Sequence, residues 1–338
     1  MKKDNYFVIA LTYIGTIIGA GFASGQEIKK FFIDYGTVGI TAFIFSAFLF
    51  FYLGKKIMEM GYESRAESYE RILTYAFTCK ARKLFDYLIV FFLIATVTTM
   101  FSGMGAIFNQ NFGLPMYIGS FITLIISVFI TIGGIDKVMK MSVVAIPILI
   151  LSTLLIALNS FGLNNFNGLY LDGSIVKSMF SGLLYVSFNV VMAISVLPVL
   201  GNECKSKSVI KNASIISGII IGICGVIICI ALLVNYGTIQ FAEVPLAILA
   251  IQSNSLYNSL YFVSFVTAVL TTAVSSLYGV YTRSNKNYAK FAFLVGIAYV
   301  CSLFGFSVLV KYLYSFMGYI GIFIILMLLW GFRKRKKV

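Results

Sequence analysis

Four glycines fall within one stretch of the first apolar segment, the run GTIIGAGFASGQE from Gly15 to Glu27. Glycine weakens a helix and exposes backbone carbonyls and amides, so this run favours an interrupted helix. Carbonyls at the end of one half-helix can bind a cation, and free amides at the start of the next can hold a carboxylate. The pair Gly15 and Gly19 is also typical of close helix packing, so for that pair both interpretations stay open.

Two later segments carry polar side chains where lipid-facing residues should be apolar. Ser181 to Asn189 form one small and polar cluster, which indicates a second and weaker interruption. In the segment 256–281, hydroxyl residues recur every three to four positions and share one helix face: Thr267, Thr271, Thr272, Ser275 and Ser276. Such hydroxyls can serve a polar site or hydrogen-bond to their own helix.

The remaining composition argues against an enzyme. Histidine is absent, which removes the commonest metal ligand and general base. The 5 cysteines are odd in number and lack paired spacing, so no disulfide or metal framework and no cofactor is expected. The formal net charge of +14 does not indicate a nucleic-acid partner, because the basic residues are spread between apolar segments.

The elements that must position these groups are transmembrane helices. Of the 338 residues, 60% are hydrophobic and 11% charged, and no polar stretch is long enough for a soluble domain. We predict an all-α membrane protein with one transmembrane domain, residues 1–338, embedded in a lipid bilayer. Ten segments are long enough to cross: about 6–31, 36–57, 84–108, 113–133, 139–160, 174–199, 209–234, 256–281, 289–309 and 312–332.

The distribution of Lys and Arg predicts the orientation. With ten crossings and a cytoplasmic N-terminus, 22 basic residues lie inside and only 4 lie outside. The four outside are Lys29, Lys30, Lys177 and Lys311. We therefore expect a multi-pass protein of the plasma membrane with both termini in the cytoplasm.

The ten segments also predict an inverted repeat. Five lie in residues 6–160 and five in 174–332, so the second half begins on the opposite side of the membrane. The longest cytoplasmic loop, 55–83, and the longest external loop, 235–255, occupy equivalent positions in the two halves. Each loop contains a short helix candidate, Tyr69 to Phe77 and Pro245 to Gln252.

With these residues in view, the chain resembles the YkvI-type amino-acid permeases of the amino acid, polyamine and organocation superfamily, which has the LeuT fold. The run from Gly15 to Glu27 and the later Leu270 to Ala273, LTTA, carry the resemblance. It implies ten transmembrane helices in a LeuT-like 5+5 inverted repeat with helices 1 and 6 broken. It also implies a secondary transporter that works by alternating access, in which a bundle of spans one, two, six and seven rocks against spans three, four, eight and nine.

The resemblance also implies the residues of two sites. A Na⁺ site would be formed by the carbonyls of Gly15 and Ile18 and the hydroxyls of Thr271 and Thr272, because hard oxygen ligands suit a hard cation. The backbone of Ala20 and Gly21 would face the carboxylate of a small solute. Further candidates for the solute site are Tyr185, Ser187, Phe188, Asn189, Thr96 and Thr99.

The charged residues within the apolar segments bear on the identity of the coupling ion and of the solute. We expect symport with Na⁺, because residues 141–160 of the fifth segment lack the lysine that proton-driven relatives often carry. Glu27 is the candidate for a gate, for proton coupling, or for a surface pair with Lys29 and Lys30. No other buried charge is expected, so a neutral amino acid fits best. The alternative is a solute receptor on the same scaffold, like spore germinant receptors, without net transport.

Overall fold

The computed structural model describes residues 5–67, 69–76, 79–132, 135–163, 173–284 and 287–335, and these parts are helical. The first half contains α1 (Tyr6–Ile17), α2 (Ala20–Ser24), α3 (Gln26–Phe31), η1 (Ile33–Tyr35), α4 (Val38–Ser64), α5 (Tyr69–Ala76), α6 (Cys79–Phe112), α7 (Met116–Ile132), α8 (Ile135–Asn159) and η2 (Ser160–Leu163). The second half contains α9 (Ile175–Ala193), α10 (Leu197–Glu203), α11 (Lys207–Val234), α12 (Tyr236–Ile239), α13 (Pro245–Ser253), α14 (Ser255–Arg283), α15 (Tyr288–Ser302), α16 (Phe306–Leu309), η3 (Val310–Tyr314) and α17 (Ser315–Arg335).

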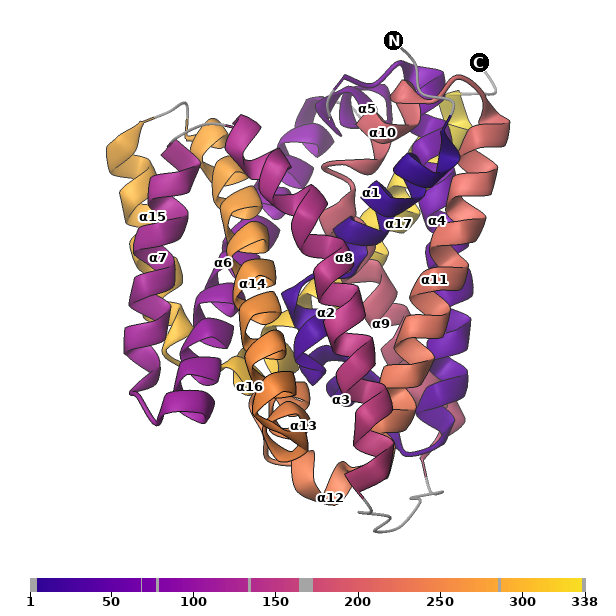
Figure 1. Ribbon diagram of the computed structural model, residues 1–338. Helices are drawn as coiled ribbons and strands as arrows, with labels where there is room; N and C mark the ends of the chain where they lie inside the picture. The colour runs from indigo at the N-terminus through magenta and orange to yellow at the C-terminus, as the bar shows by residue number, and fades with distance from the viewer. Residues whose placement is uncertain are drawn as a thin grey trace.

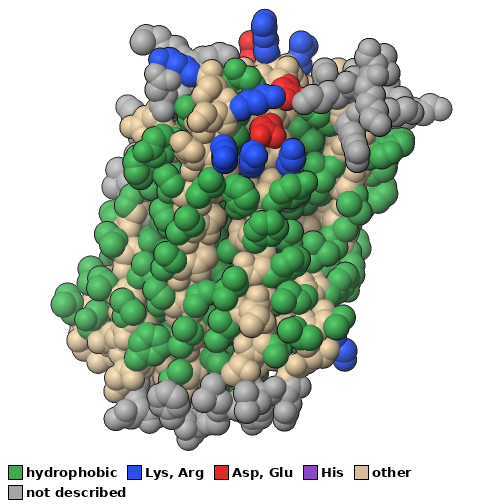
Figure 2. Space-filling view, turned by 90° about the vertical axis from the view of Figure 1, so that its right-hand side faces the viewer, with side chains coloured by type: hydrophobic (Ala, Val, Ile, Leu, Met, Phe, Trp, Pro, Cys, Tyr) green, Lys and Arg blue, Asp and Glu red, His purple; other side chains and the backbone are tan. Residues whose placement is uncertain are grey.

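The lengths of the apolar helices and the hydrophobic side chains on the surface identify a membrane protein. Among the described residues, six helices are long and apolar enough to cross a bilayer, and four shorter apolar helices accompany them. Large hydrophobic side chains cover the flank of the molecule in Figure 2, and Phe129, elsewhere on the surface, is 78% exposed. So much exposed apolar surface is stable against lipid and costly in water. The predicted all-α membrane fold is confirmed.

The helices pack in two groups (Figure 1). In one group α4 lies against α9, α10 and α11, α1 packs on α11 and α9, and α17 packs on α9. In the other group α6 packs against α7, α14 and α15. Helix α8 contacts both α14 and α11 and so joins the two groups.

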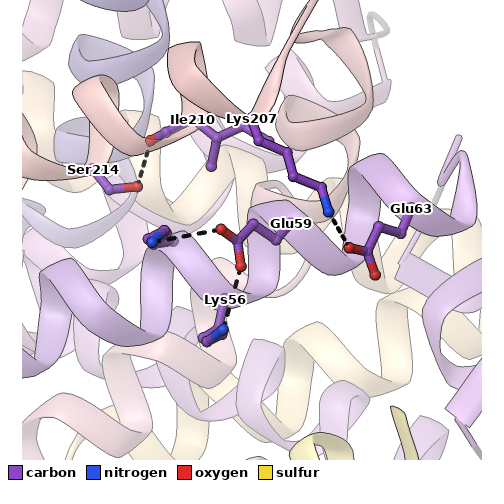
Figure 3. A network of polar contacts seen from close by, with 7 residues as sticks. Lys56, Glu59, Glu63, Lys207, Ile210 and Ser214 are labelled. Carbon is purple, nitrogen blue, oxygen red and sulfur yellow. Dashed lines mark hydrogen bonds and ion pairs between the residues drawn. The ribbon is translucent and has the colours of Figure 1, made fainter. Parts of the chain in front are cut away.

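The two ends of the molecule differ in charge. The N- and C-terminal ends lie at the same end, near α5 and α10, and α12 and α13 lie at the opposite end (Figure 1). On the face shown in Figure 2, Lys and Arg side chains gather at the end where the termini lie. Part of this charge is paired: Lys207 of α11 bonds to Glu63 of α4, and Glu59 lies 3.4 Å from Lys56 (Figure 3). The predicted short helices 69–77 and 245–252 are confirmed as α5 and α13.

Helix α4 and helix α10 touch backbone to backbone. A Cβ on Gly61 would lie 2.0 Å from the Pro198 carbonyl oxygen, and a Cβ on Gly201 would lie 2.0 Å from the Met58 carbonyl oxygen. Only residues without a side chain permit this approach. The two glycines therefore fix α10 against the end of α4.

The polar cluster Ser181 to Asn189 does not interrupt its helix, and that prediction was wrong. Helix α9 runs without a break from Ile175 to Ala193, and the chain turns only at 194–196 before α10. The side-chain amide of Asn189 donates to the Tyr185 carbonyl at 3.0 Å, and the Ser187 hydroxyl lies 2.8 Å from the Leu184 carbonyl. These polar groups are satisfied on a regular helix, so their presence does not require free backbone.

Candidate solute and cation site

The chain between α1 and α2 leaves backbone groups unpaired. Helix α1 ends at Ile17 and α2 begins at Ala20, with Ile18 and Gly19 in non-helical conformations. At the end of α1 the Ile18 amide donates a hydrogen bond to the Ile14 carbonyl, and the Gly19 amide donates one to the Ile17 carbonyl. The next backbone hydrogen bond along the chain is donated by the Ala23 amide. Within the described chain, the carbonyls of Gly15 and Ile18 therefore accept no backbone hydrogen bond. The amides of Ala20 and Gly21 likewise donate none.

Helix α14 brings a hydroxyl to this interruption. A Cβ on Gly19 would lie 3.5 Å from the Thr272 hydroxyl oxygen, so Thr272 faces the gap between α1 and α2. The neighbouring Thr271 donates to the Ala268 carbonyl at 2.9 Å, while the Thr272 hydroxyl bonds to no other described residue. Tyr261 ties the same helix to α2 through a 2.8 Å bond to the Ala23 carbonyl. Helix α14 thus places the Thr272 hydroxyl beside Gly19, in the chain between α1 and α2.

Glu27 turns back toward the same region instead of toward the surface. Gly25 has φ +76°, and this left-handed turn between α2 and α3 allows the Glu27 side chain to fold back over Gly21. A Cβ on Gly21 would lie 1.6 Å from Glu27 Oε1, so the carboxylate fills the place of that missing side chain. Glu27 is only 5% exposed.

The surface-pair interpretation of Glu27 was wrong. Lys29 pairs with Asp34 at 3.0 Å, and Lys30 lines an outer cavity. Glu27 itself makes no ion pair or hydrogen bond with the rest of the described chain. The Glu27 carboxylate is instead buried beside Gly21.

Two tyrosines complete the surroundings of Glu27. Phe31 lies one turn after Glu27 on α3, and its ring lies 5.7 Å from the Tyr185 ring, in an aromatic cluster that continues through Phe188 to Tyr314. The Tyr314 hydroxyl lies 2.7 Å from the Thr99 hydroxyl, whereas the buried Tyr185 hydroxyl has no partner among the described residues. Tyr314 belongs to the π-helical turn η3 and was missed in the sequence. A tyrosine near the end of an apolar segment is typical of a membrane interface, so the sequence pattern did not indicate that Tyr314 belongs to a binding site.

The other solute candidates lie at different distances from this centre. The Phe188 ring packs on the Tyr314 ring with centroids 4.8 Å apart, so it belongs to the same cluster. The Ser187 hydroxyl donates to the Gly318 carbonyl of α17 at 2.6 Å and is occupied there. Thr96 bonds to the Phe92 carbonyl and lies 3.6 Å from the sulfur of Met192. The Ser187 hydroxyl thus joins α9 to α17, whereas Thr96 and Asn189 bond to carbonyls of their own helices.

An aromatic ring separates the centre from an outer cavity. The cavity has a volume of about 270 Å³ and is lined by Lys30, Phe31, Tyr35, Lys177, Phe180, Ser181, Leu184, Ser315 and Tyr319. Phe31 is shared between this wall and the central cluster, since its ring lies 5.7 Å from the Tyr185 ring and 5.6 Å from the Phe188 ring. Phe31 therefore joins the wall of the cavity to the aromatic cluster of Tyr185 and Phe188.

Comparisons with known proteins agree with this architecture. No protein-family model matches the chain. YkvI of Bacillus subtilis (strain 168), an uncharacterized membrane protein, is 27% identical over 331 residues, which cover 95% of this chain and 94% of YkvI. The uncharacterized protein YyaD of the same organism is 26% identical over 326 residues, 94% of each chain.

Solved structures give the fold. The inward-facing conformation of Mhp1 matches with a TM-score of 0.64 and 15% identity, over 95% of this chain and 74% of Mhp1. A variant of the manganese transporter of Eremococcus coleocola matches with a TM-score of 0.58 and 11% identity, over 98% of this chain and 86% of that one. One of these structural neighbours is a transporter, and YkvI is a membrane protein. The chain is therefore a homologue of the YkvI and YyaD membrane proteins, built on the LeuT-type fold of Mhp1.

Proposed function

We propose that this chain is a secondary transporter that couples the movement of a small solute to Na⁺ by alternating access. The observation that carries the proposal is the interruption between α1 and α2, where the Ile18 carbonyl accepts no backbone hydrogen bond, the Thr272 hydroxyl lies beside Gly19, and a buried carboxylate lies beside Gly21. Unpaired backbone in a membrane protein is stable only where it lines a site or a cavity. The likeness of the fold to two transporters supports the same function.

The transmembrane arrangement is part of the proposal. The six long and four shorter apolar helices would make ten crossings, with α1 and α2 as halves of the first and α9 and α10 as halves of the sixth. Helices α5 and α13 follow the second and seventh crossings at opposite ends of the molecule, as a 5+5 inverted repeat requires (Figure 1). The group around α4 would move against the group around α6. Basic residues at the end with the termini favour cytoplasmic termini in the plasma membrane.

Na⁺ would bind at the α1–α14 contact. Its ligands would be the carbonyls of Gly15 and Ile18 and the hydroxyls of Thr271 and Thr272. The solute would lie on the other side of α2, between Gly21, Tyr185 and Phe188, and would reach this place from the outer cavity past Phe31. Thr99 would act there through Tyr314.

Replacing Thr272 with valine should weaken Na⁺ dependence selectively. Valine keeps the shape of threonine but removes the hydroxyl that faces Gly19. We expect the loss of one oxygen ligand of Na⁺ to cost about as much as the loss of a hydrogen bond to a charged group, about 1.5–3 kcal/mol, so half-maximal uptake should need roughly tenfold more Na⁺. Thr267→Val is the matched control, because Thr267 lies on the same helix and bonds to the Val263 carbonyl of its own backbone. An unchanged Na⁺ response in Thr272→Val would remove Thr272 from the site.

Uptake into proteoliposomes tests the function itself. Purified protein should accumulate a radiolabelled amino acid when Na⁺ is high outside, and replacing Na⁺ with K⁺ or choline should stop accumulation. A pH gradient should drive accumulation only if Glu27 carries a coupling proton. Solute binding without uptake or counterflow, under every gradient, would favour the receptor alternative and overturn the transporter.

A further inference from the structure

The Glu27 carboxylate lacks a counter-charge. It is buried, and an ionised carboxylate away from water is costly unless a cation compensates it. The cations on or near α3 are committed elsewhere, since Lys29 pairs with Asp34 and Lys30 faces the outer cavity. On the other elements packed on α3, Lys177 of α9 lines that same cavity, and Lys311 of η3 is exposed with its amino group 5.2 Å from the centre of the Tyr312 ring. No cation of the described chain therefore pairs with Glu27, and an ionised carboxylate there would need a bound cation.

The surroundings of Glu27 suit a compact cation with hydrogen-bond donors. The Tyr185 hydroxyl is fully buried and has no hydrogen-bond partner in the described structure, and the Tyr185 ring lies 5.7 Å from the ring of Phe31, one turn after Glu27 on α3. A bound group that donates to both oxygens would satisfy the carboxylate and the hydroxyl together. The rings of Tyr185, Phe188 and Tyr314 lie next to each other with centroids 4.8 to 5.6 Å apart. Aromatic faces stabilise ammonium groups through cation–π attraction.

A bare proton does not account for this arrangement. Protonation would neutralise Glu27 but would leave the aromatic rings without a role. Na⁺ has a separate place at Thr272, where the donors are hydroxyl and carbonyl oxygens. A protonated amino group uses the carboxylate, the tyrosine hydroxyl and the rings at once.

We propose that Glu27 is the counter-charge for a protonated amino group of the solute, with Tyr185 as its second hydrogen-bond partner. The proposal rests on the proposed function and names its substrate class: amino acids and other small amines, but not carboxylic acids that lack an amine. Glu27 would thereby exclude solutes whose only charge is negative. The same carboxylate leaves little room for a second negative group beside Gly21, so the solute's own carboxylate is not required for binding.

Equilibrium binding to purified protein in Na⁺ buffer tests this class without any requirement for transport. Three matched probes share one side chain: leucine, 3-methylbutylamine without the carboxylate, and 4-methylpentanoate without the amine. Analogous triplets with the side chains of alanine, valine and phenylalanine extend the panel. Thermal stabilisation and calorimetry should show binding of amine-bearing members and none of the deaminated acids. Binding of the deaminated acids, or of no amine in the panel, would overturn the proposal.

The substitution Glu27→Gln separates an ammonium partner from a proton carrier. Glutamine has nearly the same shape and mimics a protonated carboxyl, so a proton carrier would keep its affinity for the solute. Removing one partner of a buried charge pair instead weakens binding, here by roughly 30-fold or more for every amine that binds. Unchanged affinity in Glu27→Gln would overturn the proposal, even if Na⁺-driven uptake by the wild type stands.

A matched control variant and a stability measurement show whether the effect of Glu27→Gln on binding is specific. Glu243→Gln makes the same change at a carboxylate that accepts bonds from the Ser307 amide and hydroxyl, and it should leave amine affinity unchanged. Without ligand, Glu27→Gln should be at least as stable as the wild type, because it removes an uncompensated buried charge. If uptake fails with every gradient but amines still bind through Glu27, the proposed function falls and this inference holds.

Discussion

Replacing Gly21 with alanine is expected to abolish amine binding while leaving the fold intact. The new Cβ would lie 1.6 Å from Glu27 Oε1 and 2.4 Å from Glu27 Cδ, so the carboxylate must leave its place. Only the end of a flexible side chain has to move, and alanine favours the helical backbone of α2. We therefore expect amine affinity to fall by roughly 30-fold or more. The melting temperature of the unliganded protein should stay within about 3 °C of the wild type.

A double-mutant cycle shows whether the effect passes through Glu27. In the Glu27→Gln background, Gly21→Ala should weaken binding by much less than in the wild type, because the carboxylate it displaces is already gone. Calorimetric titration of one amine into the four proteins gives the coupling. Fully additive losses would show that Gly21 acts on the solute by another route.

Replacing Gly61 with alanine is expected to destabilise the folded protein strongly. The added Cβ would lie 2.0 Å from the Pro198 carbonyl oxygen and 2.5 Å from its carbonyl carbon, and backbone atoms cannot rotate away as a side chain can. Overpacking of this kind costs about 1–3 kcal/mol, and we expect the upper part of that range, since α4 and α10 must separate. Thermal unfolding in detergent measures the loss.

Gly296→Ala is the control for that change. It adds the same methyl group to a glycine of α15, where no atom lies within 4 Å of the new Cβ. Its melting temperature should equal or slightly exceed that of the wild type, because alanine favours a helix. Equal stability of Gly61→Ala and Gly296→Ala would contradict the contact between α4 and α10.

Local properties of residues explain what the sequence could predict. Glycine acts on its own backbone, so the run from Gly15 to Gly25 pointed to the region where α1, α2 and α3 meet. Helical spacing put Thr271 and Thr272 near one face of their segment, and Thr272 faces Gly19 in the structure. Apolar segment lengths gave the all-helical membrane fold. The short helices in the two long loops followed from the same periodicity.

Properties that depend on a distant neighbour could not be predicted. Glu27 lies next to two lysines in sequence, and its burial depends on the turn at Gly25 and on the space left by Gly21. Ser187 has the chemistry of a solute ligand, but close packing of α17 through Gly318 occupies its hydroxyl. The role of Tyr314 depends on a π-helical turn that brings it to Thr99.

The claim on which the account depends is that oxygen atoms near the end of α1 and on α14 hold Na⁺. Equilibrium binding of radioactive sodium to the purified protein, measured by scintillation proximity, tests it most directly. We predict saturable binding that K⁺ does not displace, that Thr272→Val greatly weakens and that Thr267→Val preserves. Absence of saturable Na⁺ binding, or equal binding by the two variants, would contradict the account.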